Sequence, residues 1–313
     1  MKQLSRRNFI HFLSASTAIA LTNPVFSKSV KNPQKAQLLQ KIIPSSQQPM
    51  TVIGMGSWQT FNVGSDPGLR DNRKEILDLF FRLGGQMVDS SPMYGSSQQV
   101  IGHGLEQLNY PQNLFSAEKV WTSDKSATRE QIQETSAAWQ VKNFDLLQVH
   151  NLVRWQEHLE VLKQMRQSGE LGYIGITTSH GRRHNDLEKV MATQPIDFVQ
   201  LTYNMVDREV EQRLLPLAQE KGIAVIANRP FQGGHLVNRL QRSQTPLPAF
   251  ASEFQCENWP QFLLKFIVSH PAVTCAIPAT TKLEHMQENM GAATGSLPNP
   301  AMRKQMLDYL KTI

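Results

Sequence analysis

Three polar side chains each end a short apolar run, and a fourth follows closely behind the first of them. Asp89, Lys119 and His150 close such runs, and Tyr94 comes five residues after Asp89. A free phenol has a pKa of about 10, and a nearby ammonium such as Lys119 is expected to lower it. Together, an aspartate, an ammonium, an imidazole and a phenol suit delivery of a proton to a carbonyl oxygen. None of these groups can donate a hydride, so carbonyl reduction also requires a redox cofactor.

The apolar runs predict the elements that position these side chains. Runs of this length are typical of buried parallel strands, and active sites of α/β proteins form at the carboxyl ends of such strands. The strand ends from Asp89 to Ala227 recur every 25 to 31 residues, the length of one strand, one helix and two loops. The pattern predicts a single-domain α/β protein, a (β/α)8 TIM barrel. The eight predicted strands are Thr51–Ile53, Gln86–Asp89, Leu114–Lys119, Phe144–His150, Tyr173–Thr177, Ile196–Thr202, Ala224–Ala227 and Val273–Ile277.

Two other arrangements of alternating strands and helices fit less well. An open doubly wound sheet usually has a glycine-rich turn and a helix after its first strand. Residues 54–58 (Gly-Met-Gly-Ser-Trp) lack the third glycine, and no helical pattern follows directly. A division into two domains is disfavoured because the repeat continues without a break.

Further elements are predicted around the barrel. A short strand pair is expected at 39–43 and around Met50, before the repeat begins. The long segment between the last two strands reads as a loop over the site, with a short helix around 236–240. Helices are expected near 283–290 and 301–310, and the second of these is expected to pack across the barrel.

Composition supports a folded protein and excludes several classes. The 313 residues are 40% hydrophobic and 19% charged, which suits a packed globular chain. The net charge of +6 includes three uncompensated cations in the first seven residues, and no basic run is interleaved with aromatic residues, so nucleic-acid binding is not expected. The two cysteines, Cys256 and Cys275, do not have the spacing of a metal site, so no metal is predicted.

The first residues resemble an export signal. Arg6-Arg7 with Phe9 precedes a short apolar stretch and a small-residue exit, which resembles a twin-arginine signal peptide over residues 1–27. Residues 28–37 then form a linker and residues 38–313 the barrel. This interpretation places the folded protein in the periplasm after recognition by the twin-arginine machinery. A disordered basic arm is the alternative, and because 25–27 is not an Ala-x-Ala site, a retained membrane anchor also stays open.

The motifs around the four polar residues resemble the aldo-keto reductase superfamily. They are Asp89-Ser-Ser-Pro-Met-Tyr94-Gly95, Lys119, Leu-Gln-Val-His150 and the Gly-Met-Gly-Ser-Trp opening at 54–58, in the right order within residues 38–291. The resemblance implies that Tyr94 is the general acid, supported by Asp89, Lys119 and His150. It also implies a small-molecule carbonyl substrate and NADPH held across the barrel mouth.

The same resemblance implies positions for the cofactor and the substrate. Asn228 stands where many members have an aromatic residue that stacks on nicotinamide, and Arg229 would contact the pyrophosphate or an acidic substrate. Thr280, Thr281 and Lys282 suit a ribose 2′-phosphate, which favours NADPH over NADH. The remaining expected contacts are Thr177, Thr178 and Gln200 to the carboxamide, Glu288 and Asn289 to adenine, and Trp58 and Met93 in the substrate pocket.

These residues indicate three candidate functions. The first is an NADPH-dependent reductase that converts an aldehyde or ketone to an alcohol, with the proton coming from Tyr94. The second is an exported NADP(H)-binding sensor or partner subunit with little turnover, which the loss of an aromatic at Asn228 would suit. The third, a barrel hydrolase, is disfavoured because it needs paired carboxylates or a metal cluster at the strand ends.

Overall fold

Eight parallel strands form the barrel of this protein. The computed structural model describes residues 37–313, in which each strand from β3 to β10 pairs with the next one along the chain. A bridge between Ile53 and Ala276, continued by the hydrogen bond from the Gly54 amide to the Ala276 carbonyl (2.9 Å), joins the two ends of the sheet. The predicted (β/α)8 barrel is confirmed. The strands are β3 Met55–Gly56, β4 Met87–Asp89, β5 Phe115–Val120, β6 Leu146–His150, β7 Tyr173–Thr177, β8 Phe198–Thr202, β9 Ala224–Asn228 and β10 Val273–Ala276.

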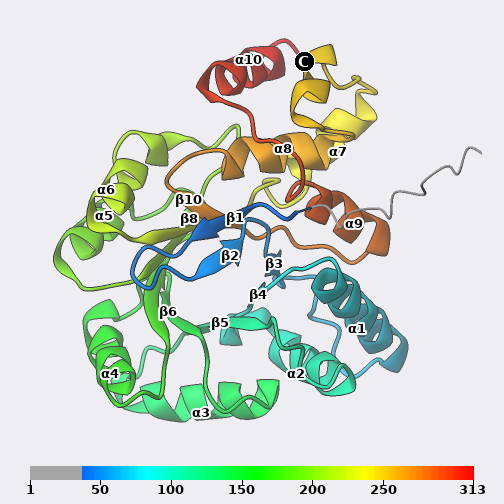
Figure 1. Cartoon of the computed structure of the whole chain (residues 1–313). Coiled ribbons are helices and arrows are strands. Elements are labelled where there is room, and N and C mark those ends of the chain that lie inside the picture. Colours follow the sequence, from blue (N-terminus) through cyan, green and yellow to red (C-terminus); the bar gives the residue numbers. More distant parts are fainter. Residues whose placement is uncertain (1–36) are drawn as a thin grey trace, which may run out of the picture. The chain divides into compact units, whose positions relative to one another are not determined.

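Helices surround the strands on the outside (Figure 1). α8 shows how the sequence starts them: the Asn258 side chain accepts a hydrogen bond from the Gln261 amide, and Pro260 lies in the first turn. None of the helices in residues 37–313 has the length and apolar content needed to cross a bilayer. The helices are α1 Pro67–Arg82, α2 Ser97–Gln107, α3 Thr128–Trp139, α4 Trp155–Gln167, α5 His184–Thr193, α6 Leu214–Lys221, α7 His235–Arg242, α8 Trp259–Val268, α9 Leu283–Gly291 and α10 Pro300–Leu310.

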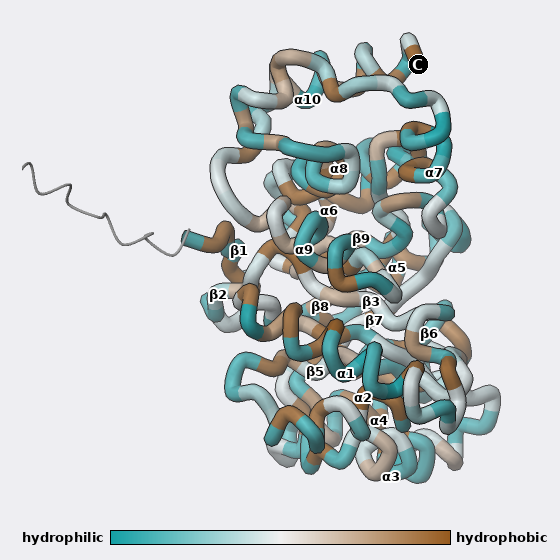
Figure 2. The backbone as a smooth tube through the Cα atoms, turned by 90° about the vertical axis from the view of Figure 1, so that its right-hand side faces the viewer, coloured by the Kyte–Doolittle hydropathy of each residue, from teal (hydrophilic) through white to brown (hydrophobic). Residues whose placement is uncertain are grey.

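The predicted strand pair before the barrel is confirmed, and it closes one end of the barrel. β1 (Gln40–Ile42) and β2 (Pro49–Thr51) pair antiparallel. Ile43 and Met50 pack against the residues that begin several barrel strands. Figures 1 and 2 show this hairpin at one end of the barrel, so the interior opens at the carboxyl ends of the strands.

The first barrel strand lies later in the chain than the sequence predicts. Thr51 belongs to the hairpin, and the barrel strand is Met55–Gly56, preceded by the single bridge at Ile53. The run 50–53 is apolar enough for either role, and periodicity cannot say which partner it pairs with. Gly56 suits the closure because a Cβ there would lie 2.9 Å from the Ile277 carbonyl oxygen.

Two expectations for the last third of the chain have different outcomes. The short helix in the long segment before β10 is confirmed as α7, and a 3-10 helix at Ala249–Phe254 (η4) was not expected. The terminal helix α10 exists, but it lies outside α8 instead of across the barrel (Figures 1 and 2). Arg303 of α10 explains this position, because its guanidinium stacks over the Phe266 ring of α8 at 4.0 Å. The predicted leader at 1–27 lies outside the described residues, as does nearly all of the predicted linker.

Candidate active site

A buried ion pair lies at the carboxyl ends of β4 and β5. The Lys119 ammonium is 2.6 Å from Asp89 Oδ2 and donates a second hydrogen bond of 2.6 Å to the Ser90 carbonyl. Both side chains are almost fully buried. Burial disfavours the charged ammonium, but the negative charge of Asp89 and the neighbouring acids holds the pKa of Lys119 above its usual value. Lys119 is therefore a fixed positive charge.

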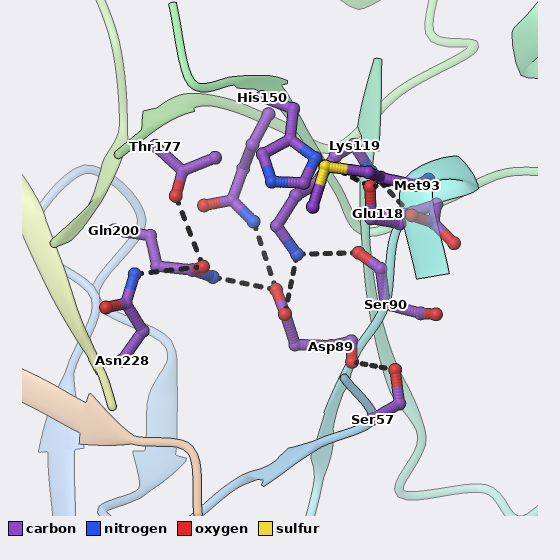
Figure 3. Close-up of polar contacts among 12 residues, drawn as sticks. Ser57, Asp89, Ser90, Met93, Glu118, Lys119, His150, Thr177, Gln200 and Asn228 are labelled. Carbon is purple, nitrogen blue, oxygen red and sulfur yellow. Dashed lines mark hydrogen bonds and ion pairs between the residues drawn. The ribbon is translucent and has the colours of Figure 1, made fainter. Parts of the chain in front are cut away.

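The other atoms of Asp89 are also held (Figure 3). Oδ1 accepts hydrogen bonds from the side-chain amides of Gln200 (2.8 Å) and Gln148 (3.3 Å). The Ser57 hydroxyl donates to the Asp89 carbonyl at 2.8 Å. Side chains from three strands thus fix the carboxylate, which in turn fixes the ammonium, and the loop after β3 holds the backbone of Asp89.

Tyr94 and His150 lie beside this ion pair. Tyr94 ends the 3-10 helix η1 (Pro92–Tyr94), and its ring centroid is 5.2 Å from Lys119 Nζ. The His150 ring meets the Tyr94 ring edge-on, with centroids 5.7 Å apart. The structure therefore brings together the four residues that the sequence placed at one edge of the sheet.

The expected decrease in the pKa of Tyr94 is wrong. Burial raises the pKa of the phenol to about 12, although the Lys119 ammonium acts in the opposite direction. The sequence argument considered the nearby cation but not the loss of water around the hydroxyl. The phenol of Tyr94 is therefore protonated and neutral near physiological pH.

His150 is held as a neutral imidazole. Burial, assisted by the charge of Lys119, lowers the pKa of His150 to about 3. Its Nδ1 lies 2.6 Å from the Ser91 hydroxyl oxygen, which already accepts a hydrogen bond from the Met93 amide. We assign the Ser91 hydroxyl as the donor and His150 Nδ1 as the acceptor of this bond, so that the ring hydrogen of the neutral imidazole lies on Nε2.

A cavity of about 260 Å³ opens beside Tyr94 and His150. Trp58 and Met93, the two residues predicted for the substrate pocket, line it, and each is 38% exposed. The cavity wall also includes residues that the sequence analysis did not single out. They are Gln59, Thr60, Ser179, His180, Pro230 and Phe231, together with the glycines of the loop after β9.

Three of the predicted nicotinamide contacts form a hydrogen-bonded row on β7, β8 and β9. The Thr177 hydroxyl donates to Gln200 Oε1 at 3.2 Å, and the Asn228 amide lies 3.5 Å from the same oxygen. All three line the cavity. Asn228 also donates to the Thr178 carbonyl (2.8 Å) and accepts from the Thr202 hydroxyl (2.8 Å), so its side chain is fixed. Thr178 itself is buried and is not part of the cavity wall.

Arg229 and the predicted adenosine-end residues have different surroundings. Arg229 is half-buried on the cavity wall and forms no ion pair within residues 37–313. Thr280, Thr281 and Lys282 precede α9, and Glu288 and Asn289 lie on it, outside the cavity wall. Glu288 Oε2 is buried without a hydrogen-bond partner among the described residues. The Lys282 ammonium is largely exposed, and its contact with Glu284 is long, at 4.0 Å.

Several residues of the site were missed by the sequence analysis. Gln148 precedes His150 by two positions in β6, and strand alternation turns both side chains to the same face, which is a signal that the sequence contains. Ser57 and Ser91 lie in loops, where no regular alternation of polar and apolar residues indicates which side chains face the site. Glu118, directly before Lys119, is a fully buried acid inside an apolar run.

Comparison with known proteins places the chain in a family and agrees with the fold. The model of the Aldo/keto reductase family matches residues 52–304. The NADH-specific methylglyoxal reductase of Escherichia coli is 23% identical over 331 aligned residues, covering 87% of this chain and 99% of that protein. A second methylglyoxal reductase of the same organism is 25% identical, covering 80% of this chain and 88% of that protein.

Solved structures have the same fold. An aldo-keto reductase from Klebsiella pneumoniae in complex with NADPH superposes with a TM-score of 0.73 at 21% identity, covering 88% of this chain and 95% of that one. The aldo-keto reductase AKR11C1 from Bacillus halodurans gives 0.71 at 20% identity, covering 88% and 96%. With a family match over most of its length, this chain belongs to the aldo/keto reductase family.

Proposed function

We propose that this protein reduces an aldehyde or ketone to an alcohol with NADPH as the hydride donor. The observation that carries the proposal is the convergence of Tyr94, His150 and the Asp89–Lys119 pair beside one cavity at the strand ends. The two methylglyoxal reductases among the relatives make a small reactive aldehyde a suitable first substrate.

In this proposal Tyr94 gives its proton to the carbonyl oxygen as that oxygen gains charge. Its pKa of about 12 keeps the phenol protonated until that moment. The Lys119 ammonium, held by Asp89, then stabilises the phenolate that forms. His150 donates a hydrogen bond from its Nε2–H group to the same carbonyl oxygen. This bond orients the substrate before the proton of Tyr94 moves.

The side chains present fit a nicotinamide dinucleotide, which supplies the hydride when bound. Gln200 and Thr177 offer an amide and a hydroxyl to a carboxamide, and the unpartnered Glu288 Oε2 offers an acceptor to an adenine amino group. Lys282, near the amino end of α9, would face a ribose 2′-phosphate. One relative is NADH-specific, whereas a similar solved structure holds NADPH, so Lys282 is the reason to favour NADPH.

A cofactor-binding sensor or partner subunit is the second candidate. The observation that favours it is Asn228, whose side chain is fixed by Thr178 and Thr202 and offers no aromatic surface to nicotinamide. A protein of this kind would retain the nucleotide and turn over slowly.

One assay separates the two candidates. Purified protein is mixed with NADPH or NADH and a panel of aldehydes that includes methylglyoxal, and loss of the reduced nicotinamide absorbance is followed. We expect multiple turnovers with NADPH. Tight binding of NADPH with no turnover on any aldehyde would support the sensor and reject the reductase.

We also propose that residues 1–27 direct export of the folded protein to the periplasm through the twin-arginine machinery. The support is the Arg6-Arg7 pair and the apolar stretch that follows it. Replacement of both arginines by lysine should leave the protein inside the cell in fractionation, and an unchanged distribution would reject the proposal.

A further inference from the structure

A second buried acid lies directly behind Lys119. Glu118 precedes Lys119 in β5, and because strand residues alternate, its side chain points out of the barrel toward α2 and α3. Glu118 is 0% exposed. Oε2 accepts hydrogen bonds from the Gln98 amide (3.0 Å) and the Trp139 indole (2.8 Å), and Oε1 accepts from the Lys119 backbone amide (2.8 Å).

The surroundings of Glu118 leave Lys119 as its one cationic neighbour among the described residues. Gln98 of α2 and Trp139 of α3 are neutral donors, and the charged groups that act on Glu118 are Lys119 and Asp89. One ammonium therefore lies near two buried carboxyl groups, of which only Asp89 touches it. Figure 3 shows Glu118 near Lys119, away from the Asp89 side.

The charge of Glu118 is poised to change near neutral pH. Burial raises the pKa of Glu118 to about 7, against the opposing effects of Lys119 and Gln98. When ionised, Glu118 raises the pKa of Lys119 and also that of Tyr94. These effects act through the low-dielectric interior, where a charge is weakly screened.

We propose that Glu118 is a positioning residue that tunes the acidity of Tyr94 through Lys119, and this inference rests on the proposed reductase function. Its backbone contact holds the Lys119 strand position, and its negative charge makes Tyr94 a weaker acid. A purely structural link between β5, α2 and α3 would need only a hydrogen-bond acceptor at this place. An ionisable carboxyl there adds a charge that reaches the reacting groups.

Three variants test the inference by the pH profile of kcat/KM for aldehyde reduction. Glu118→Gln removes the charge, so Tyr94 becomes more acidic and the fall of kcat/KM at high pH should begin about one pH unit lower. Glu118→Asp restores the charge and should return that fall to the wild-type position. Trp139→Phe removes one hydrogen bond to Oε2 but keeps the carboxyl. It should therefore lower the stability of the protein without changing the pH at which kcat/KM begins to fall.

A second measurement covers the case in which Glu118→Gln does not fold. The wild-type rate of reduction should rise modestly as the pH falls through about 7, because protonation of Glu118 makes Tyr94 a stronger acid. Gln98→Met removes a hydrogen-bond donor that favours the ionised form of Glu118, so the change in rate near pH 7 should move to higher pH. Identical pH profiles for wild type and Gln98→Met, with no change in rate near pH 7, would overturn the inference. A wild-type protein that reduces none of the aldehydes would instead overturn the proposed function.

Discussion

Two lysines within residues 37–313 are almost completely buried, and their side chains have different partners. Lys119 is 1% exposed and Lys265 is 0% exposed. Lys119 lies inside the barrel against a carboxylate, beside a cavity. Lys265 lies on α8, outside the barrel, and donates to three backbone carbonyls and to no carboxylate. Those carbonyls belong to Phe254 (2.6 Å), Thr294 (2.8 Å) and Ser296 (3.1 Å).

The partners explain the difference between the two ammonium groups. The carboxylate of Asp89 holds the pKa of Lys119 above its usual value in spite of burial, whereas burial lowers the pKa of Lys265. Lys265 ties α8 to η4 and to the segment that follows α9. A buried lysine is therefore not by itself a sign of catalysis. A carboxylate partner and a cavity next to it are what distinguish Lys119.

Loss of the Lys119 charge should have the largest effect on activity. Lys119→Met removes the cation that stabilises the Tyr94 phenolate, so kcat for aldehyde reduction should fall about a thousandfold. Stopped-flow assays at saturating NADPH would measure this, and circular dichroism would verify the fold, because breaking a buried pair also lowers stability. A loss smaller than tenfold would mean that Lys119 resembles Lys265 after all.

The matching change at Lys265 should act on stability alone. Lys265→Met leaves the Phe254, Thr294 and Ser296 carbonyls, the first of them buried, without their donor, so the free energy of unfolding should decrease by about 3 kcal/mol. Urea titration would measure the decrease, and kcat below the unfolding range should stay within about twofold of wild type. A large fall in kcat of the folded variant would contradict the assignment of a structural role.

The contrast between the two lysines also marks what the sequence can predict. Lys119 ends an apolar run, so its place at the strand ends follows from local pattern and from the regular repeat. The partners of Lys265 come from two separate segments, and no periodicity relates them to α8. The pKa of Tyr94 was missed for a similar reason, since burial depends on how the loop after β4 folds over the site. Likewise, the sequence does not show whether residues 50–53, before β3, pair with β1 or with the barrel strands.

A third lysine, Lys282, is exposed, and its replacement should have the smallest effect of the three. The Lys282 side chain is 58% exposed and has one long contact with Glu284. If it binds the 2′-phosphate, Lys282→Glu should reduce the preference for NADPH over NADH by about tenfold, because a like charge replaces an attractive one. Titration with both nucleotides would measure this. Lys304→Glu, on an exposed face of α10, is the matched control and should leave the preference unchanged.

We propose that Tyr94 gives the proton while Asp89, Lys119 and His150 hold it and tune its acidity, and one measurement tests this directly. Wild type and Tyr94→Phe are each loaded with NADPH and mixed with methylglyoxal in a single-turnover experiment, after their NADPH affinities have been compared by titration. We predict equal affinities and a rate of nicotinamide oxidation at least about a hundredfold lower in Tyr94→Phe. Equal rates in the two proteins would contradict the account, because proton transfer would then not depend on the phenol.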